Sequence, residues 1–292
     1  MLIIAMIILS VVLYAFCVPF RIFIENPFST FKYGVKDIFF YFTRYKDIPK
    51  KCYFRVYTGL FGQGKTLSAV RDVISFYNQF NDKRVYDDRL KEYVTQKVFI
   101  LSNVDLKGVP YRKWRSLQQV VNIARWRHHT DKKRKQRTIT ICLGDEFSVN
   151  MNSRQFSKNL SPTALNSFLC SRHALIQGFF LTSQRFGQMD ALLRQVTQEV
   201  VECKKYWRFC VNTVYDGWEM ENSSSPDLCK KKSVIGYFAN NALYDSYDTL
   251  QMVENLAKET DNGSMIPPEI ERANLNQRLV VNARVVKNKK RK

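Results

Sequence analysis

A glycine-rich octapeptide between a predicted strand and a predicted helix constrains the fold of this 292-residue chain more than any other feature. Residues 59–66 read GLFGQGKT and satisfy the pattern G-x-x-x-x-G-K-[ST]. Residues 52–58 carry aromatic and β-branched side chains, as a strand does, and apolar residues recur at helical spacing after the motif. In this setting backbone N–H groups can surround phosphates at a helix N-terminus. The sequence therefore predicts a phosphate-binding loop, with a chance glycine-rich turn as the alternative.

The loop predicts ATP and Mg²⁺ as ligands. The ammonium group of Lys65 would reach the β- and γ-phosphates, and the hydroxyl group of Thr66 would ligate Mg²⁺. The residues that we expect to bind the nucleotide are Gly59, Gly62, Gln63, Gly64, Lys65, Thr66 and Leu67.

Two carboxylates follow a second predicted strand. Residues 138–147 read TITICLGDEF, an apolar run that ends in Asp145 and Glu146. In proteins with such a loop, an aspartate after a buried strand holds Mg²⁺, and an adjacent glutamate can act as general base on the attacking water. We therefore predict Asp145 as a metal ligand, Glu146 as the base and hydrolysis as the reaction. An ordinary acidic surface turn is the alternative.

A third predicted strand, residues 177–185, ends in polar side chains. Gln184 at its tip could hydrogen-bond the lytic water or the γ-phosphate. Arg172 and Arg194 flank this strand in the sequence, and either could act on the nucleotide of a neighbouring subunit. Each arginine could equally face solvent or DNA.

The order of elements predicts the fold class. Strands and helices alternate through residues 52–200, which is typical of an α/β three-layer core with a mostly parallel sheet. Residues 98–106 form another predicted strand whose end would line the nucleotide site. Residues 199–220 and 233–239 are expected to add strands, including a β-hairpin at the edge of the sheet.

Residues 2–20 are apolar and contain no charged side chain. As one helix they would rise about 28 Å, close to the thickness of the hydrocarbon core. Seven Lys and Arg against three Asp and Glu follow within residues 21–51, which predicts that the remainder is cytoplasmic. We thus expect a transmembrane anchor over residues 1–22 and a juxtamembrane segment over residues 23–51. A cleaved signal peptide and a buried core helix are the alternatives.

The formal net charge of +20 calls for an anionic partner, either nucleic acid or an anionic membrane face. Residues 122–137 carry seven Lys and Arg and one Asp, and residues 278–292 carry seven Lys and Arg and no acid, so both read as basic arms. Trp126 lies within the first and would suit stacking on single-stranded bases, although a solvated loop is the alternative. The second could bind phosphates or lipid headgroups.

Seven cysteines without a C-x-x-C pair argue against a disulfide scaffold and a zinc ribbon.

Five motifs together resemble the Zot-like family, the zonular-occludens-toxin-type assembly ATPases of filamentous phages within the FtsK–HerA superfamily. In chain order they read GLFGQGKT, ICLGDEF, MNSRQF, CSRHALIQGFFLTSQR and MDALLRQV, and the resemblance covers roughly residues 52–200. It implies a RecA-like P-loop ATPase domain, which we expect over residues 52–250, a sensor role for Gln184 and a hexameric ring. The basic, polar residues that follow are expected to form a tail over residues 251–292. In such a ring, Arg172 or Arg194 would act in trans.

The resemblance and the apolar N-terminus combine into one functional expectation. The chain would be a membrane-anchored, Mg²⁺-dependent ATPase that moves or extrudes DNA, expected to be single-stranded, during filamentous-phage-type virion assembly. It would cross the inner membrane of a bacterial host once, with phage coat or assembly proteins as partners. Family members usually carry their membrane helix after the ATPase domain, and a periplasmic part follows that helix. Here the apolar segment comes first and about 40 basic, polar residues follow position 250, so we expect no toxin activity. A conjugative or FtsK-like translocase, a packaging ATPase of a membrane-containing virus and a non-catalytic nucleotide-binding scaffold remain alternatives.

Overall fold

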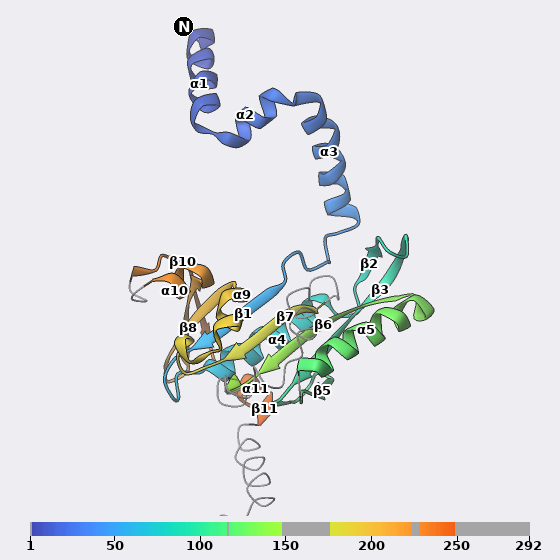
Figure 1. Ribbon diagram of the computed structural model, residues 1–292, viewed down its shortest axis with the longest axis vertical. Coiled ribbons are helices and arrows are strands. Elements are labelled where there is room, and N and C mark those ends of the chain that lie inside the picture. The colour runs from blue at the N-terminus through green and yellow to red at the C-terminus, as the bar shows by residue number, and fades with distance from the viewer. Residues whose placement is uncertain (1, 116, 148–175, 224–227, 249–292) are drawn as a thin grey trace, which may run out of the picture.

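A nine-stranded sheet forms the centre of the computed structural model, which describes residues 2–115, 117–147, 176–223 and 228–248 (Figure 1). The strand order is β10-β9-β8-β1-β7-β6-β3-β2, and β5 pairs with β3 off this path. The strands of this sheet are β1 (Tyr53–Thr58), β2 (Arg84–Asp87), β3 (Glu92–Ser102), β5 (Tyr111–Lys113), β6 (Gln136–Gly144), β7 (Ile176–Thr182), β8 (Glu199–Tyr206), β9 (Phe209–Asp216) and β10 (Lys231–Phe238). A small second sheet pairs β4 (Asp105–Leu106) with β11 (Tyr247–Asp248).

The middle of the large sheet is parallel. Strands β8, β1, β7, β6 and β3 run in one direction, whereas β9, β10 and β2 are antiparallel to their neighbours. The α/β class with a mostly parallel sheet is therefore confirmed.

Helices cover both faces of the sheet. They are α4 (Lys65–Phe80), α5 (Leu117–Arg134), α9 (Ala191–Val196), α10 (Gly217–Asn222) and α11 (Asn241–Tyr244), with the 3-10 turn η2 (Phe186–Gln188) before α9. Val73 of α4 packs with Ile141 in one buried cluster, and Ile123 of α5 packs with Leu181 in another. Because both faces are covered, β6 and β7 are buried along most of their length, which explains their nearly continuous apolar sequences.

The parallel strands place their carboxyl ends at one edge of the sheet. The phosphate-binding loop follows β1, Asp145 follows β6, and Gln184 lies just beyond β7. Residues far apart in the sequence thereby meet at this edge, as is usual for ligand sites of open α/β sheets.

Two segments of the fold compare directly with the sequence expectations. The predicted hairpin is confirmed as β8 and β9, with β10 completing an antiparallel edge. The basic arm expected over residues 122–137 is wrong, because most of it belongs to α5, whose Val120 and Ile123 are buried. Asp131 of α5 is also buried and accepts hydrogen bonds from the backbone N–H and the hydroxyl group of Thr138 at 2.7 Å each. The second basic segment lies outside the described residues.

Three helices precede the sheet, α1 (Leu2–Phe16), α2 (Val18–Glu25) and α3 (Pro27–Thr43). The single continuous helix expected over residues 2–20 is divided at Cys17, whose backbone is extended. Pro19 explains the break, since it has no N–H to donate to the preceding turn and its ring crowds that turn. The guanidinium group of Arg21 instead donates to the carbonyl groups of Tyr14 at 3.2 Å and Ala15 at 3.0 Å.

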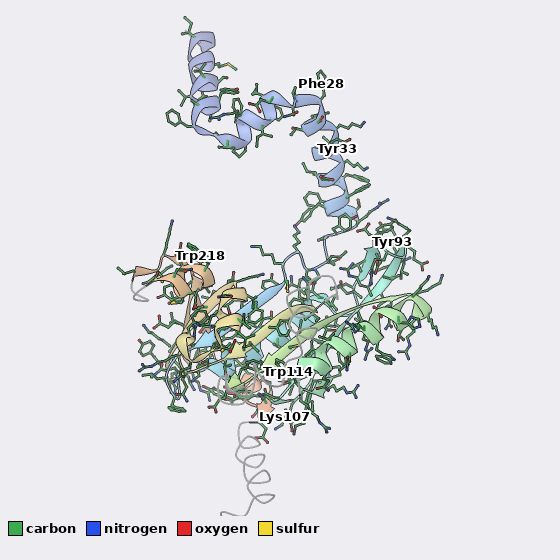
Figure 2. The ribbon with its side chains drawn as sticks, in the orientation of Figure 1. Phe28, Tyr33, Tyr93, Lys107, Trp114 and Trp218 are labelled. Atoms are coloured by element: carbon green, nitrogen blue, oxygen red, sulfur yellow. The ribbon has the colours of Figure 1, made fainter. Side chains whose placement is uncertain are left out.

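In the described part of the chain, no helix combines the length and the apolarity needed to span a membrane, so the predicted transmembrane helix is not supported. Figure 2 shows Phe28 and Tyr33 on α3, at a distance from the sheet, and Phe28 is 90% exposed. No described residue of α2 or α3 is buried.

Candidate functional site

Glycines with positive φ angles, which other residues rarely adopt, shape the loop between β1 and α4. Gly64, at the N-terminus of α4, has a φ of 77°. Gly59 has a φ of 147°, and a Cβ atom there would lie 2.8 Å from the backbone oxygen of Cys203. Only glycine fits that position, so the start of the loop packs directly against β8.

Lys65 is buried within this loop. Its ammonium group donates a hydrogen bond to the carbonyl oxygen of Leu60 at 3.1 Å, so the side chain folds back over the loop. This places a positive charge beside the backbone N–H groups at the start of α4, where a phosphate group would be favoured by the charge and by the helix dipole together.

Thr66 and Asp145 lie side by side although 79 positions separate them in the sequence. The Thr66 hydroxyl donates to Asp145 Oδ1 at 2.7 Å, and the Thr182 hydroxyl donates to the same oxygen at 2.5 Å. The structure thus brings together the two residues that the sequence predicts as metal ligands. A carboxylate oxygen that accepts two hydroxyl groups is held in one orientation.

The residues around Asp145 fit Mg²⁺. A hydroxyl oxygen and a carboxylate oxygen are hard ligands, and adjacent ligands of an octahedral Mg²⁺ at about 2.1 Å lie about 3 Å apart, close to the Thr66–Asp145 separation. Among the described residues, no group of three or more His, Cys, Asp or Glu side chains could hold a metal. A magnesium ion here would take its other ligands from phosphate and water, as this ion usually does.

Asn103 fixes the backbone of Asp145. Its side-chain amide donates to the Asp145 carbonyl oxygen at 2.9 Å, and its side-chain oxygen accepts from the Asp145 N–H at 2.8 Å. The next residue, Glu146, is half-buried with a φ of 46°, and its N–H donates to the Thr182 hydroxyl at 2.8 Å. The predicted base therefore follows the predicted metal ligand on a backbone that two neighbouring strands hold.

Sequence reasoning gave no role to Thr182 and did not identify Tyr247. Thr182 is the last residue of β7, and its position between Asp145 and the Glu146 N–H follows from the pairing of β6 with β7. Tyr247 of β11 lies near Asp145: burial and then the negative charge of Asp145 raise the pKa of Tyr247 to about 12. The signal for Thr182 was present, because it is a polar residue at the carboxyl end of a buried strand.

The other predicted residues occupy different surroundings. The Gln184 carbonyl oxygen accepts from the Gly59 N–H at 3.3 Å, and its sensor role stays a prediction. Arg194 donates to Glu221 at 2.7 Å and to the carbonyl oxygens of Gly187 and Met189 at 3.0 and 2.8 Å, so it joins α9, α10 and the loop after β7 within its own chain. Arg172 lies outside the described residues.

Gln63 connects the loop to the β8–β9 hairpin. Its side-chain oxygen accepts a hydrogen bond from the backbone N–H of Lys205 at 3.0 Å. Leu67, another predicted nucleotide contact, is buried with Cys210 and Ala239, so only its backbone can serve a ligand. The loop is thus attached to the hairpin on the side away from Asp145.

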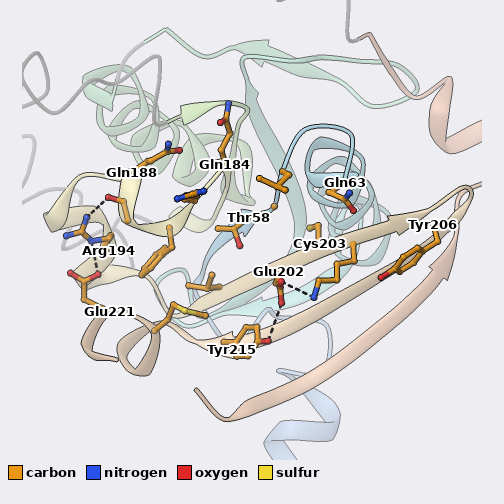
Figure 3. A pocket seen from close by; sticks show the side chains of 18 residues that line it. Thr58, Gln63, Gln184, Gln188, Arg194, Glu202, Cys203, Tyr206, Tyr215 and Glu221 are labelled. Carbon is orange, nitrogen blue, oxygen red and sulfur yellow. Dashed lines mark hydrogen bonds and ion pairs between the residues drawn. The ribbon is translucent and has the colours of Figure 1, made fainter. Parts of the chain in front are cut away.

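A cavity of about 970 Å³ adjoins the loop on the face of the sheet opposite α4 (Figure 3). Gly59 and Gln63 border it at the loop, Gln184 and Arg194 border it on another side, and Tyr206 of β8 lies at its edge. Neither Lys65 nor Asp145 lines it. The cavity therefore lies next to the predicted phosphate site and not within it.

A polar network under α4 holds β1 in place. Tyr57, fully buried, donates to Asp72 of α4 at 2.6 Å, and Arg55 donates to Asp72 at 3.2 Å and to Glu199 of β8 at 2.6 Å. Burial and the Asp72 carboxylate hold the pKa of Tyr57 well above its usual range, so its hydroxyl group remains a donor. This network explains how β1, α4 and β8 keep a fixed arrangement behind the loop.

No family model matches the chain, and no curated protein sequence matches it. Among solved structures, the chain is similar to the N-terminal domain of zonular occludens toxin from Neisseria meningitidis, with 16% identity, a TM-score of 0.41, and coverage of 68% of this chain and 100% of that domain. It is also similar to ATPases 2 and 3 of EssC from Geobacillus thermodenitrificans, with 13% identity, a TM-score of 0.39, and coverage of 73% of this chain and 44% of that one.

A third similar structure is the genome packaging NTPase of Sulfolobus turreted icosahedral virus 2, with 9% identity, a TM-score of 0.38, and coverage of 65% of this chain and 97% of that one. The structural neighbours thus include the zonular occludens toxin type that the sequence motifs resemble. All three TM-scores lie below 0.5.

Proposed function

We propose that this chain hydrolyses ATP with Mg²⁺ at the edge of the sheet between β1 and β6. The observation that carries the proposal is the contact of Thr66 with Asp145 at 2.7 Å, beside a loop that holds the buried Lys65. A chance glycine-rich turn would not place a hydroxyl group from its helix against a carboxylate from another strand. This arrangement supports adjacent positions for the phosphates, the metal and the base.

Each residue has a defined task in this reaction. The loop N–H groups and Lys65 would bind the phosphates, and Thr66 and Asp145 would hold Mg²⁺, which would neutralise charge on the phosphates. Glu146 accepts the proton of the attacking water. Thr182 and Asn103 orient Asp145 and Glu146 and do not touch the nucleotide themselves.

The test is Mg²⁺-dependent ATP hydrolysis by the purified full chain and three variants. Glu146→Gln should retain ATP binding and lose turnover by about 10²- to 10⁴-fold, because only proton transfer is removed. Lys65→Ala should lose ATP binding as well. Lys83→Ala, at an exposed lysine just beyond the far end of α4, is the matched control and should leave both unchanged.

A wild-type chain that binds ATP but has no turnover that depends on Glu146 would contradict this proposal. That result would favour a non-catalytic scaffold in which nucleotide only orders the fold.

We further propose that hydrolysis is coupled to DNA movement during filamentous-phage-type virion assembly. The order of the sequence motifs and the net charge of +20 support this. Single-stranded DNA should stimulate turnover more than duplex DNA of the same length, and Lys65→Ala should abolish the stimulation. Equal turnover with and without either DNA would contradict the coupling and leave the ATPase proposal intact.

A ring of identical subunits is part of the same proposal, with Arg172 or Arg194 acting on the nucleotide of the next subunit. Mass photometry with ATP and Mg²⁺ should detect hexamers. Because Arg194 has three partners within its own chain, Arg194→Ala should also lower the melting temperature. A trans role requires in addition that an Arg194→Ala subunit mixed with a Lys65→Ala subunit recovers turnover.

We also propose attachment to the inner membrane of a bacterial host through residues 1–25, with the sheet on the cytoplasmic side. The exposed apolar side chains of α1 and α2, among them Ile4, Leu9 and Ile22, support this. The full chain should float with phospholipid vesicles, and Ile4→Asp with Leu9→Asp should abolish flotation. Resistance to alkaline carbonate extraction would distinguish a spanning segment from one that lies in the interface, and no flotation at all would contradict attachment.

A further inference from the structure

Three aromatic side chains form a row across the antiparallel edge of the sheet. Tyr206 of β8 pairs with Phe209 of β9, which pairs with Phe238 of β10. Directly paired residues point to the same face of a sheet, so the three rings share one face. It is the face opposite α4, since Val201 and Cys203 of β8 pack in the α4 cluster and Tyr206 has the opposite orientation.

This row is exposed to solvent, and no described helix packs over it. Tyr206, Phe209 and Phe238 are 66%, 57% and 51% exposed. The Phe209 and Phe238 rings lie 5.4 Å apart, centroid to centroid, in an edge-on arrangement. Large aromatic side chains at adjacent positions on an open sheet face are typical of a surface that contacts a partner.

Trp207 adds a fourth ring. It lies in the tight turn between β8 and β9 with a φ of 54°, a conformation in which glycine or asparagine is more favourable than tryptophan. Its side chain is 73% exposed and its ring lies 6.1 Å from the rings of Phe209 and of Phe238. Neither burial nor turn preference explains a tryptophan here, whereas a contact outside the chain does.

Cationic side chains lie at the same end of the hairpin as this aromatic row, which we define as Tyr206, Trp207, Phe209 and Phe238. Residues 203–209 contain three Lys and Arg and no Asp or Glu: Lys204, Lys205 and Arg208. Lys204 precedes Tyr206 by two positions on β8, so it shares the face of the row, and the Arg208 guanidinium lies 6.0 Å from the centre of the Trp207 ring. Lysine is depleted in the cores of protein–protein interfaces, so aromatic rings among lysines favour an anionic partner with flat apolar groups.

We propose that the aromatic row binds single-stranded nucleic acid, with unpaired bases stacked on the rings and phosphates beside the neighbouring cationic side chains. Stacking needs bases whose faces are accessible, which a duplex does not offer. The proposal rests on the DNA coupling proposed above, because it names the surface and the form of the polymer through which that coupling acts. It assigns the contact to the edge of the sheet next to the phosphate-binding loop.

Fluorescence anisotropy with labelled dT20 and the full chain tests this assignment, with an abasic strand of the same length as the second ligand. Trp207→Ala with Phe238→Ala should weaken dT20 binding by about ten-fold or more per ring removed and leave abasic binding almost unchanged. Trp207→Phe with Phe238→Tyr retains the rings and should retain most of the affinity. Trp218→Ala, at a 72% exposed tryptophan of α10 outside the row, should bind like wild type.

Salt dependence separates the contribution of the cationic side chains from that of the rings. Lys204→Ala with Arg208→Ala should reduce the slope of log affinity against log salt concentration by about one for each phosphate that is no longer neutralised, whereas the aromatic variants should not change the slope. Thermal melting of every variant excludes loss of folding as the cause.

Three outcomes would overturn the proposal. A folded Trp207→Ala, Phe238→Ala variant that binds dT20 like wild type would do so and leave the DNA coupling in place. A wild-type chain that binds no nucleic acid but retains Lys65-dependent ATP hydrolysis would remove both this proposal and the coupling. A change in oligomer size of the aromatic variant without DNA, at unchanged dT20 affinity, would assign the row to contacts between copies.

Discussion

At the residue scale, one hydroxyl group contacts both the predicted metal ligand and the backbone of the predicted base. The hydroxyl group of Thr182 donates to Asp145 at 2.5 Å and accepts from the Glu146 N–H at 2.8 Å. It therefore uses its donor and one acceptor position within the site. Thr182 is a positioning residue, because it acts on the nucleotide only through its neighbours.

Thr182→Val should raise the Mg²⁺ concentration needed for half-maximal ATPase activity, because Asp145 loses a donor that orients it. It should also cost about 1–3 kcal/mol of stability, since the N–H of the half-buried Glu146 loses its acceptor. Titration of ATPase activity with Mg²⁺ measures the first effect and urea unfolding the second. Thr182→Ser keeps the hydroxyl group and should restore the Mg²⁺ response; failure of this rescue would argue for a packing role.

Gly59 and Gly62 give a matched pair of substitutions within one loop. Gly59→Ala should be the more destabilising, because its Cβ atom would lie 2.8 Å from the Cys203 carbonyl oxygen in addition to the unfavourable backbone conformation. Gly62 has a φ of 75° but open space around it, so Gly62→Ala should cost only about 1–2 kcal/mol. Urea unfolding of the two variants compares them, and equal losses would contradict the packing argument.

The sequence alone predicts some residues of the site and not others. Lys65 and Thr66 could be predicted because the spacing of one motif fixes both on one loop and helix. Asp145 followed from its position after an apolar strand. Thr182 and Asn103 lie at the ends of predicted strands, but their hydrogen-bond partners could not be assigned, because these depend on which strands pair with β6, and sequence periodicity does not contain that information.

At the scale of elements, α5 combines a buried attachment with a charged outer side. Asp131 near its end receives the backbone N–H and the hydroxyl group of Thr138 at the start of β6. A count of charges along the sequence identified the basic residues but could not show that the helix is packed. The burial of Val120 and Ile123 decides this, because their helical spacing matches the apolar face of the sheet.

Asp131→Ala should destabilise the protein by about 2–4 kcal/mol, since it leaves the buried N–H of Thr138 without its carboxylate partner. Thr138→Val keeps the backbone hydrogen bond to Asp131 and removes the two hydrogen bonds of the hydroxyl group, to Asp131 and from Gln136, and should cost about 1 kcal/mol. Chemical denaturation gives both values. A loss of less than about 1 kcal/mol in Asp131→Ala would show that the link between α5 and β6 is not important for stability.

At the scale of the whole molecule, stability should depend on acid pH through carboxylates that bridge elements. Burial raises the pKa of Glu199, but the positive charge of Arg55, its hydrogen bond, and Lys232 outweigh burial, so the pKa lies below the usual value. A carboxyl group with a lowered pKa in the folded state stabilises folding above its ordinary pKa. That contribution is lost as the pH falls through the lowered value.

The free energy of unfolding should therefore decrease from about pH 5 downwards. Glu199→Gln should be less stable at neutral pH and should show a flatter decline in acid than wild type. Glu92→Gln, at a more exposed glutamate that contacts Lys135 at 3.4 Å, should retain the wild-type decline. Urea unfolding at a series of pH values measures this, and parallel curves for Glu199→Gln and wild type would contradict it.

The overall architecture shows how far the sequence predicts a fold of this kind. Alternating strands and helices predict the α/β class and the parallel sheet, because each apolar pattern is local. The order β8-β1-β7-β6-β3 is not contained in any local pattern, since it depends on crossover connections between distant strands. The break at Cys17, in contrast, could have been predicted from a local signal. Pro19 lies within the apolar run and interrupts a helix there, but a measure of hydropathy alone does not register it.

The hydrogen bond from the Lys205 N–H to Gln63 has a consequence for energetics. It joins the phosphate-binding loop to the hairpin that carries the aromatic row, so nucleotide on the loop and nucleic acid on the hairpin share one connection. Thermodynamic linkage then requires reciprocity: the factor by which ATP changes the affinity for dT20 equals the factor by which dT20 changes the affinity for ATP. In Gln63→Ala both factors should move toward one, and the two ligands should bind independently.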